Sequence, residues 1–413
     1  MPMTGTRQLM RRTDFRWLWS GQTISVLGSQ VAGLAFPVLA VSILKANEAQ
    51  MGLLNAADTA AFLFFGLIAG AWVDRWRKRK VMIVADAVRL AATALIPLLW
   101  YLDVLNIYHL MAVGAVVGIA TVFFDVAYQS YVPVLLPSEH IGPANSALET
   151  TNQIARIGGP SVVGVLLGIF KAPMLLVVDA ISYALSAFSL MMIRDEEKPQ
   201  PKEERQPLRK DIAEGVAFVW QQKMIRAIAM CTASTNLFST ICMTLLPLLL
   251  LRDLELTPAI YGTMMSVASV GGLIGAVSTT PLIKLLGEGP VIAASAVIGG
   301  LAFLLVPLAA TLPREYAIVL VAAAEFISFF TILTYNITQV TARQRLCPKP
   351  LLGRMNASIR FFVWGVMPIG SLIGGWLGST FGILPTMWIG AVGTLLSAGF
   401  VVFNPVSRLR EVA

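Results

Sequence analysis

Charged residues and cysteines are scarce in this chain, and each scarcity excludes a class of protein. Only 13% of the 413 residues are charged, whereas about a quarter are charged in an average soluble domain. The three cysteines, Cys231, Cys242 and Cys347, lack CxxC spacing, and the two histidines, His109 and His140, belong to no cluster of ligand residues. We therefore expect no disulfide framework, no metal site and no cofactor.

The chain also lacks the motifs of an enzyme. No Walker phosphate loop is present, so the chain has no motif for hydrolysing ATP. No catalytic cluster rich in His or Asp occurs, and the longest hydrophilic stretch has about 18 residues, which leaves no room for an appended sensor domain. The sequence predicts that the protein is not an enzyme.

Apolar residues dominate instead, at 56% of the chain. A soluble protein of this length could not hide so much apolar surface from water, but a lipid bilayer removes the problem. The net charge of +8 does not predict a nucleic-acid partner, because the basic residues form short clusters between long apolar runs. The first of these runs is too long for a signal peptide.

The apolar runs predict an all-α membrane protein with twelve transmembrane helices. Crossing the hydrocarbon core takes about 20 helical residues. The runs lie at roughly 17–44, 50–73, 81–102, 107–134, 143–170, 173–193, 226–251, 258–283, 289–311, 315–342, 353–380 and 383–403. We expect an N-terminal six-helix bundle (1–193), a charged linker (194–222) and a C-terminal six-helix bundle (223–413), with a central cavity between the bundles. From the end of the linker into the start of the second bundle, residues 212–226 have the composition of an amphipathic helix on the membrane surface.

Loop charges predict the orientation. If both termini are cytoplasmic, 24 of the 31 Lys and Arg residues lie in cytoplasmic tails and loops, and four lie outside. This distribution follows the positive-inside rule and predicts a multi-pass protein of the bacterial plasma or inner membrane.

An internal repeat relates the two halves. Pro137 and the segment GPANSALE (142–149) match Pro348 and GRMNASIR (353–360) at an offset of 211. The same offset pairs Asp125 with Asn336 and Gly164 with Gly375, and an offset of 210 pairs Pro37 with Pro247, Gly52 with Gly262 and Asp74 with Lys284. Such a parallel repeat predicts a pseudo-two-fold axis along the membrane normal.

Two segments resemble those of a known superfamily. The loop GLIAGAWVDRWRKRKVMIVAD (66–86) resembles the signature loop of the major facilitator superfamily, although Trp76 or Arg77 stands where that loop usually has a glycine. The resemblance implies a conformational-switch loop, in which the basic residues hold the loop at the anionic inner leaflet. Its residues here are Gly70, Asp74, Arg75, Lys78 and Arg79.

The segment ARIGGPSVVGVLLG (155–168) resembles the antiporter signature of exporters in that superfamily, which implies a seal against leak. Its residues are Gly158, Gly159, Pro160 and Gly164. Gly164 and Gly168 form a small-xxx-small pair that predicts close helix packing, and Pro160 predicts a bend. Ordinary glycine packing is the alternative. Segments 14–41 and 123–160 resemble the branch of macrolide and multidrug effluxers and enterobactin-type siderophore exporters.

Charged residues inside the spans are costly in hydrocarbon and need a partner or a role. Asp86 and Arg89 lie on one helix face and are expected to pair. Asp125, Glu149 and Arg156 are candidates for proton coupling, because burial and a nearby guanidinium shift a carboxyl pKa in opposite directions. Static charge pairing between helices is the alternative. Asp58 is a further candidate for binding a proton or a cationic drug.

Polar residues of the spans are candidates for lining the cavity, and helix packing is the alternative for many of them. They are Gln22, Asn55, Gln129, Asn152, Asn236, Tyr335, Asn336, Gln339 and Arg360. Arg360 occupies the repeat position of Glu149, so the halves carry opposite charges at equivalent places.

The resemblance implies a monomeric secondary transporter in the lipid bilayer that exports amphipathic, drug-like small molecules in exchange for protons by alternating access. A dedicated siderophore or metabolite exporter of the same fold is the alternative. Import is disfavoured by the glycine–proline segment.

Overall fold

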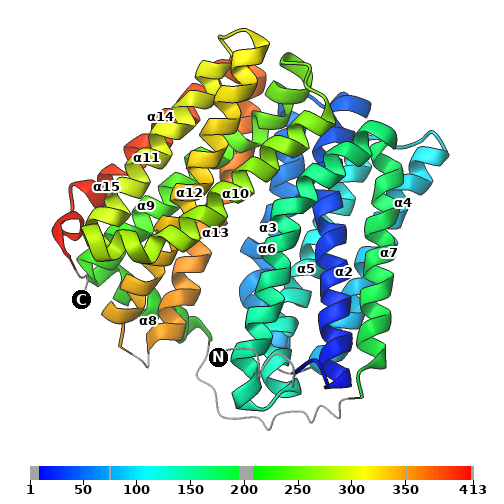
Figure 1. Ribbon diagram of the computed structural model, residues 1–413, viewed down its shortest axis with the longest axis horizontal. Coiled ribbons are helices and arrows are strands. Elements are labelled where there is room, and N and C mark those ends of the chain that lie inside the picture. The colour runs from blue at the N-terminus through cyan, green and yellow to red at the C-terminus, as the bar shows by residue number, and fades with distance from the viewer. Residues whose placement is uncertain (1–8, 74–75, 195–207, 349–350, 411–413) are drawn as a thin grey trace. The chain divides into compact units, whose positions relative to one another are not determined.

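All regular structure in the described part of the chain is helical. The computed structural model describes residues 9–73, 76–194, 208–348 and 351–410, and no strand occurs among them. The helices of the first half are α2 (Thr13–Val38), α3 (Glu48–Val73), α4 (Lys78–Tyr101), α5 (Ile107–Leu135), α6 (Ser138–Ile169) and α7 (Ala172–Met192). Those of the second half are α8 (Leu208–Gln221), α9 (Lys223–Leu248), α10 (Pro258–Leu286), α11 (Glu288–Ala309), α12 (Arg314–Leu346), α13 (Leu352–Phe381), α14 (Ile383–Ser397) and α15 (Gly399–Val402) (Figure 1).

Local sequence signals set several helix ends. At the start of α5, the Asn106 side chain accepts hydrogen bonds from the backbone N–H groups of Tyr108 and His109, and His109 Nδ1 accepts one from the backbone N–H of Asn106. This reciprocal arrangement satisfies donors that the first turn of a helix leaves free. The turn between α13 and α14 is made at Gly382, whose φ of 87° favours glycine.

Ten helices of the described residues are long and apolar enough to cross a membrane. Together they make the chain a multi-pass membrane protein. The helices α3 and α6 are long but are not among the ten. In α6, Glu149, Asn152 and Arg156 lie along one stretch and lower its hydropathy.

The chain divides into two compact units. Unit 1 holds residues 1–46, 57–202 and 257–262, and unit 2 holds 47–56, 203–256 and 263–413. The first turns of α3 therefore cluster with unit 2, and the first turns of α10 cluster with unit 1. The sequence predicts that the chain divides at the linker between residues 193 and 223, with every helix wholly in one bundle. It does not predict this exchange of helix ends.

Helix bounds and helix neighbours repeat between the two halves. The helix α2 continues as a π-helix over Leu39–Ile43, and α9 continues as one over Leu249–Asp253, at an offset of 210. In the first half α2 packs against α6 and α7, while α4 packs against α5 and α7. In the second half α9 packs against α13 and α14, while α11 packs against α12 and α14. The equivalent neighbours agree with a duplicated unit.

The amphipathic segment of the linker is helical, but its bounds and packing differ from the expectation. The helix α8 spans Leu208–Gln221, and a new helix, α9, starts at Lys223. The helix α8 packs against α13, and Val219 of α8 lies there in a buried cluster with Met355 and Ile359. Burying this apolar face against a protein helix removes it from water as a membrane surface would.

Candidate functional site

An ion pair lies buried inside unit 1. Arg89 Nη2 donates to Asp86 Oδ1 at 2.7 Å, and the two side chains are 5% and 0% exposed. The guanidinium carbon of Arg89 also lies 4.1 Å from the ring centroid of Phe124 and 4.8 Å from that of Tyr183. The expected pairing of Asp86 with Arg89 is confirmed. Aromatic rings from α5 and α7 complete the site through cation–π contacts.

A second buried carboxyl group, Asp179, lies one turn before Tyr183 on α7. Asp179 is 1% exposed, and the Ser182 hydroxyl lies 3.4 Å from its Oδ1 while donating to its backbone carbonyl at 2.7 Å. The missing side chain of Gly28 on α2 makes room for both residues, because a Cβ there would collide with them. Asp179 also interacts electrostatically with Arg89, so the interior of unit 1 holds two acidic side chains near one guanidinium.

The predicted proton-coupling residues lie on α5 and α6. Asp125 is half-buried, and Glu149 and Arg156 are exposed. Glu149 Oε1 accepts a hydrogen bond from Gln153 Nε2 at 2.6 Å. Both carboxylates lie within electrostatic reach of the phenol of Tyr128, one turn after Asp125. The structure therefore places Asp125 and Glu149 in one region of unit 1.

Although only a short loop joins α5 to α6, α6 packs mainly along α2. Trp19 of α2 donates to the hydroxyl of Thr151 of α6 at 3.1 Å, and Gly159 of α6 leaves room for the side chain of Gln30 of α2. A short loop fixes only the two helix ends that it joins. Small residues and side-chain hydrogen bonds decide where the rest of a helix packs.

Only part of the predicted switch loop can be placed. Gly70 lies in α3, while Asp74 and Arg75 lie outside the described residues. Lys78 is buried at the start of α4. Arg79 donates to the backbone carbonyls of Leu190 and Met191 at 2.8 and 2.7 Å, so it caps the end of α7.

The glycines of the predicted antiporter-like segment differ in what they contact. A Cβ on Gly164 would lie 2.8 Å from the carbonyl oxygen of Pro258 and 3.0 Å from Gly262 Cα, so α6 meets the first turns of α10 here. A Cβ on Gly158 or Gly168 would meet nothing within 4 Å. The expectation that Gly168 shares the packing is therefore wrong, because the contact with α10 does not extend one turn further along α6 to Gly168.

Pro160, where a bend is expected, does not interrupt α6, which is one helix over Ser138–Ile169.

The crossing of α6 with α10 recurs in unit 2 between α13 and the first turns of α3. A Cβ on Gly52 would lie 2.7 Å from Gly375 Cα. The sequence repeat pairs Gly52 with Gly262 and Gly164 with Gly375, so the duplicated glycines make duplicated contacts.

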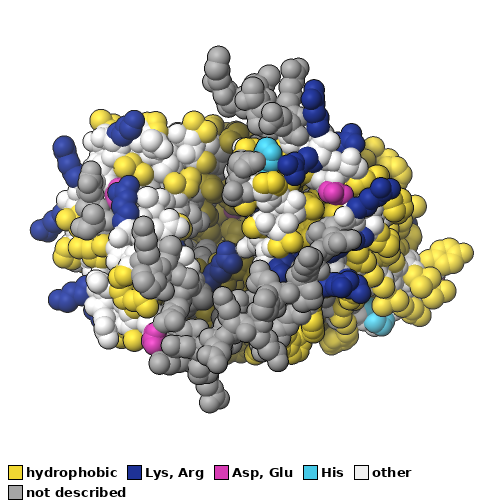
Figure 2. All heavy atoms as spheres, turned by 90° about the horizontal axis from the view of Figure 1, so that it is seen from below, with side chains coloured by type: hydrophobic (Ala, Val, Ile, Leu, Met, Phe, Trp, Pro, Cys, Tyr) yellow, Lys and Arg dark blue, Asp and Glu magenta, His cyan; other side chains and the backbone are white. Residues whose placement is uncertain are grey.

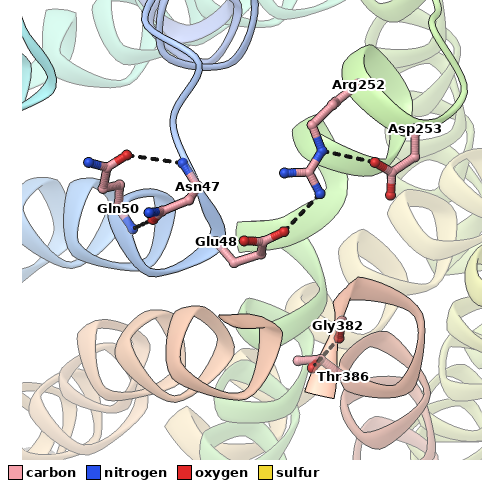
Figure 3. A network of polar contacts seen from close by, with 7 residues as sticks. All are labelled: Asn47, Glu48, Gln50, Arg252, Asp253, Gly382 and Thr386. Carbon is pink, nitrogen blue, oxygen red and sulfur yellow. Dashed lines mark hydrogen bonds and ion pairs between the residues drawn. The ribbon is translucent and has the colours of Figure 1, made fainter. Parts of the chain in front are cut away.

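A polar network joins the first turn of α3 to the end of α9 within unit 2 (Figure 3). Asn47 and Gln50 exchange hydrogen bonds between side chain and backbone at 2.9 and 3.0 Å, which caps α3. Arg252 donates to Glu48 Oε1 at 2.8 Å and to Asp253 Oδ1 at 2.9 Å. The Arg252 side chain is 43% exposed, so the pair contributes at most about 1 kcal/mol to stability.

A cavity of about 100 Å³ lies inside unit 2 among α9, α11, α12 and α14. Its lining contains many hydroxyl-bearing side chains, with Thr232, Ser295, Ser328 and Thr394 as one example from each helix. None of the lining residues is charged. We take this cavity as the candidate binding site.

Three of the predicted cavity residues line this space, namely Asn236, Tyr335 and Asn336. Tyr335 Oη lies 2.9 Å from Thr232 Oγ1, and Asn236 Nδ2 donates to the carbonyl of Val363 at 2.8 Å. Gln339, one turn after Tyr335, lies 3.4 Å from the side chain of Asn336.

The other predicted cavity residues do not line this space. They are Gln22, Asn55, Gln129, Asn152, Gln339 and Arg360. Gln22 and Asn152 are half-buried in helices of unit 1, Gln129 is exposed there, and the Arg360 guanidinium lies 5.9 Å from the ring centroid of Trp364. Asp58 is exposed on α3, and its backbone carbonyl lies against Gly118 of α5.

Sequence reasoning missed the serine and threonine residues of the cavity. Thr331 and Thr394 donate to carbonyls of their own helices at 3.0 and 2.8 Å, as such residues commonly do in membrane helices. Their spacing carried a signal, because Ser328, Thr331 and Tyr335 recur every three or four residues and so share one face of α12.

This arrangement of helices is shared with solved structures of membrane transporters. A bacterial homologue of the iron transporter ferroportin, solved in its inward-facing state, matches 96% of this chain and 98% of its own with a TM-score of 0.78. The sequence identity is 15%, so the likeness shows the fold alone.

The chain belongs to the transmembrane secretion effector family of the major facilitator superfamily, whose family model matches residues 4–412. The multidrug efflux pump Tap of Mycolicibacterium fortuitum is 26% identical over 400 residues, covering 93% of each chain. The macrolide efflux protein A of Streptococcus pyogenes is 22% identical over 410 residues, covering 97% of this chain and 98% of its own. These relatives and structural neighbours are transporters.

Proposed function

We propose that this protein is a secondary active transporter that exports amphipathic, drug-like small molecules in exchange for protons. The observation that carries the proposal is the uncharged cavity among four apolar helices of unit 2. A cavity that combines apolar surface with uncharged polar groups is typical of a site for an amphipathic ligand. The whole-length similarity to proteins named as multidrug and macrolide efflux pumps supports export.

The proposal includes the finer architecture. Adding α3 and α6 to the ten apolar helices gives twelve spans in two six-helix bundles, and the repeated bounds and neighbours of the helices support this count. Alternating access then exposes the site to each side of the membrane in turn. We place both termini in the cytoplasm and take the protein as a monomer. Figure 2 supports this orientation, because Lys and Arg side chains outnumber acidic ones on the end that it shows.

Asp125 or Glu149 is the proposed proton carrier, with Arg156 on the same helix as Glu149 modulating it. A carboxyl group that alternately meets the two sides can take up a proton on one side and release it on the other. Their shared position near Tyr128 supports this role.

Transport in everted membrane vesicles tests the proposal. An imposed proton gradient should drive uptake of a substrate from a panel of fluorescent dyes and macrolides. We expect Asp125→Asn or Glu149→Gln to lower proton-driven uptake roughly tenfold or more, since the loss of one coupling proton removes the driving force. Asp103→Asn is the matched control, because Asp103 lies in a loop with a positive φ that asparagine also adopts.

Unchanged proton-driven uptake in both amide variants would show that the proton binds elsewhere. Uptake of a siderophore but of no dye or macrolide would favour the dedicated exporter. No uptake of any compound by the unmodified protein would reject the proposed function.

A further inference from the structure

The cavity of unit 2 and the ion pair of unit 1 occupy equivalent places in the repeat. The cavity lies among α9, α11, α12 and α14. The ion pair on α4 has its aromatic partners on α5 and α7, beside α2. These four helices are the repeat partners of those that enclose the cavity, at offsets of 210 and 211.

The two places differ in what fills them. At an offset of 210, Arg89 corresponds to Gly299 and Asp86 corresponds to Ala296, and both Gly299 and Ala296 line the cavity. Unit 1 thus carries a salt-bridged side chain between two rings, where unit 2 has small residues and open space. The hollow in unit 2 follows from two large-to-small differences between the repeats.

The chemistry of the lining limits what can occupy the hollow. No lining residue is charged, and Glu325, one turn before Ser328 on α12, is not part of the lining. Several hydroxyl groups are already bonded inside the protein, including those of Thr232, Thr331 and Thr394. A charged occupant would therefore find no counter-charge in the lining, which makes its burial costly.

The size of the hollow sets a second limit. A sealed cavity of about 150 Å³ is large enough for benzene, and this one has about 100 Å³ and is not sealed. It can therefore take a single ring that reaches in from its open side.

We propose that this cavity is a subsite that takes one uncharged, mainly apolar ring of the exported molecule and rejects charged groups. The proposal rests on the proposed function for the identity of the molecule, but the binding chemistry can be tested without transport. Charged parts of a substrate must then lie outside this subsite.

A native cysteine reports on the occupant. Cys231 lines the cavity and is 1% exposed. The purified protein is treated with methyl methanethiosulfonate, a small neutral thiol reagent, and the extent of labelling at each cysteine is followed by peptide mass spectrometry. Benzyl alcohol, benzylammonium and benzoate are the competing probes, because they share one ring and differ in charge.

We expect about 10 mM benzyl alcohol to slow labelling of Cys231 roughly tenfold, if a ligand of this size binds with a Kd of about 1 mM. Benzylammonium and benzoate should leave the rate unchanged. Cys347, which lies after α12 and outside the cavity lining, should label at the same rate with every probe. The variant Ala296→Leu should fill the space and remove the protection by benzyl alcohol.

Equal protection by all three probes, or none by benzyl alcohol, would overturn the proposal. So would a Cys231 that labels only after denaturation. The competition uses the unmodified protein, so the result stands even if Ala296→Leu fails to fold. If benzyl alcohol alone protects Cys231 but the protein exports no dye, the subsite stands and the efflux function is rejected. If the protein exports dyes but benzyl alcohol does not protect Cys231, the efflux function stands and the subsite is rejected.

Discussion

Arg89 shows how one residue can organise the interior of a membrane bundle. Its guanidinium bonds Asp86 of its own helix and contacts the rings of Phe124 and Tyr183 from two others. Asp86 Oδ2 and Arg89 Nε have no hydrogen-bond partner among the described residues. The stability of each charge therefore depends on its partners inside the bundle, because both side chains are buried.

Removing Arg89 alone should be strongly destabilising. We expect Arg89→Met to lower the free energy of unfolding by about 3–5 kcal/mol, because it leaves a buried carboxylate without its partner. The double variant Arg89→Met, Asp86→Asn should lower the free energy of unfolding by less, because it leaves no carboxylate at position 86. Unfolding in mixed detergent micelles measures both. Arg156→Met, at an exposed arginine of α6, is the control, and an equal loss in this variant would contradict the importance of burial.

Close helix crossings are the main feature at the scale of elements. Two of them use glycine on both helices, Gly164 with Gly262 and Gly52 with Gly375. In a bilayer the hydrophobic effect does not drive helices together, so close backbone packing becomes a principal attraction. The crossings occur where the first turns of α10 and α3 cluster with the opposite half of the chain.

Two substitutions on α6 compare a glycine that packs against another helix with a glycine that does not. Gly164→Val should destabilise the protein by about 1–3 kcal/mol, because its side chain would overlap the backbone of α10. Gly168→Val should change stability by less than about 0.5 kcal/mol, because a Cβ there meets no atom within 4 Å. Thermal unfolding in detergent distinguishes them, and similar losses in both would refute the assigned contact.

At the scale of the whole molecule, the distribution of basic residues predicts which side of the membrane the termini and loops face. The basic residues concentrate in segments that a cytoplasmic placement of both termini would keep inside. Lys45 and Lys171 are among the few that this placement puts outside.

Cysteine accessibility in intact cells tests this orientation. A membrane-impermeant maleimide should label Lys171→Cys in intact cells, and Arg408→Cys only after the membrane is permeabilised, because charged reagents do not cross the bilayer. The unmodified protein measures the background from its own cysteines. The reverse pattern would show that the termini face outward.

Features that depend on nearby residues could be predicted from the sequence. Asp86 and Arg89 are three residues apart on one helix, so helix geometry alone brings them together. Phe124 and Tyr183 could not be assigned to Arg89, because tertiary packing joins positions 35 and 94 residues away from it. The expectation for Gly168 failed for the same reason, since the spacing of glycines does not say how far along the helix the contact with a neighbouring helix extends.

The sequence by itself determined the membrane class, the helix positions and the repeat, because apolar length and local helical geometry decide them. Only the tertiary structure decided that Arg89 fills the space among four helices of unit 1, while the equivalent space in unit 2, beside Gly299 and Ala296, is a cavity. A cavity exists where side chains from several helices fail to fill the space between them. That depends on how four helices pack together, which no single stretch of the chain specifies.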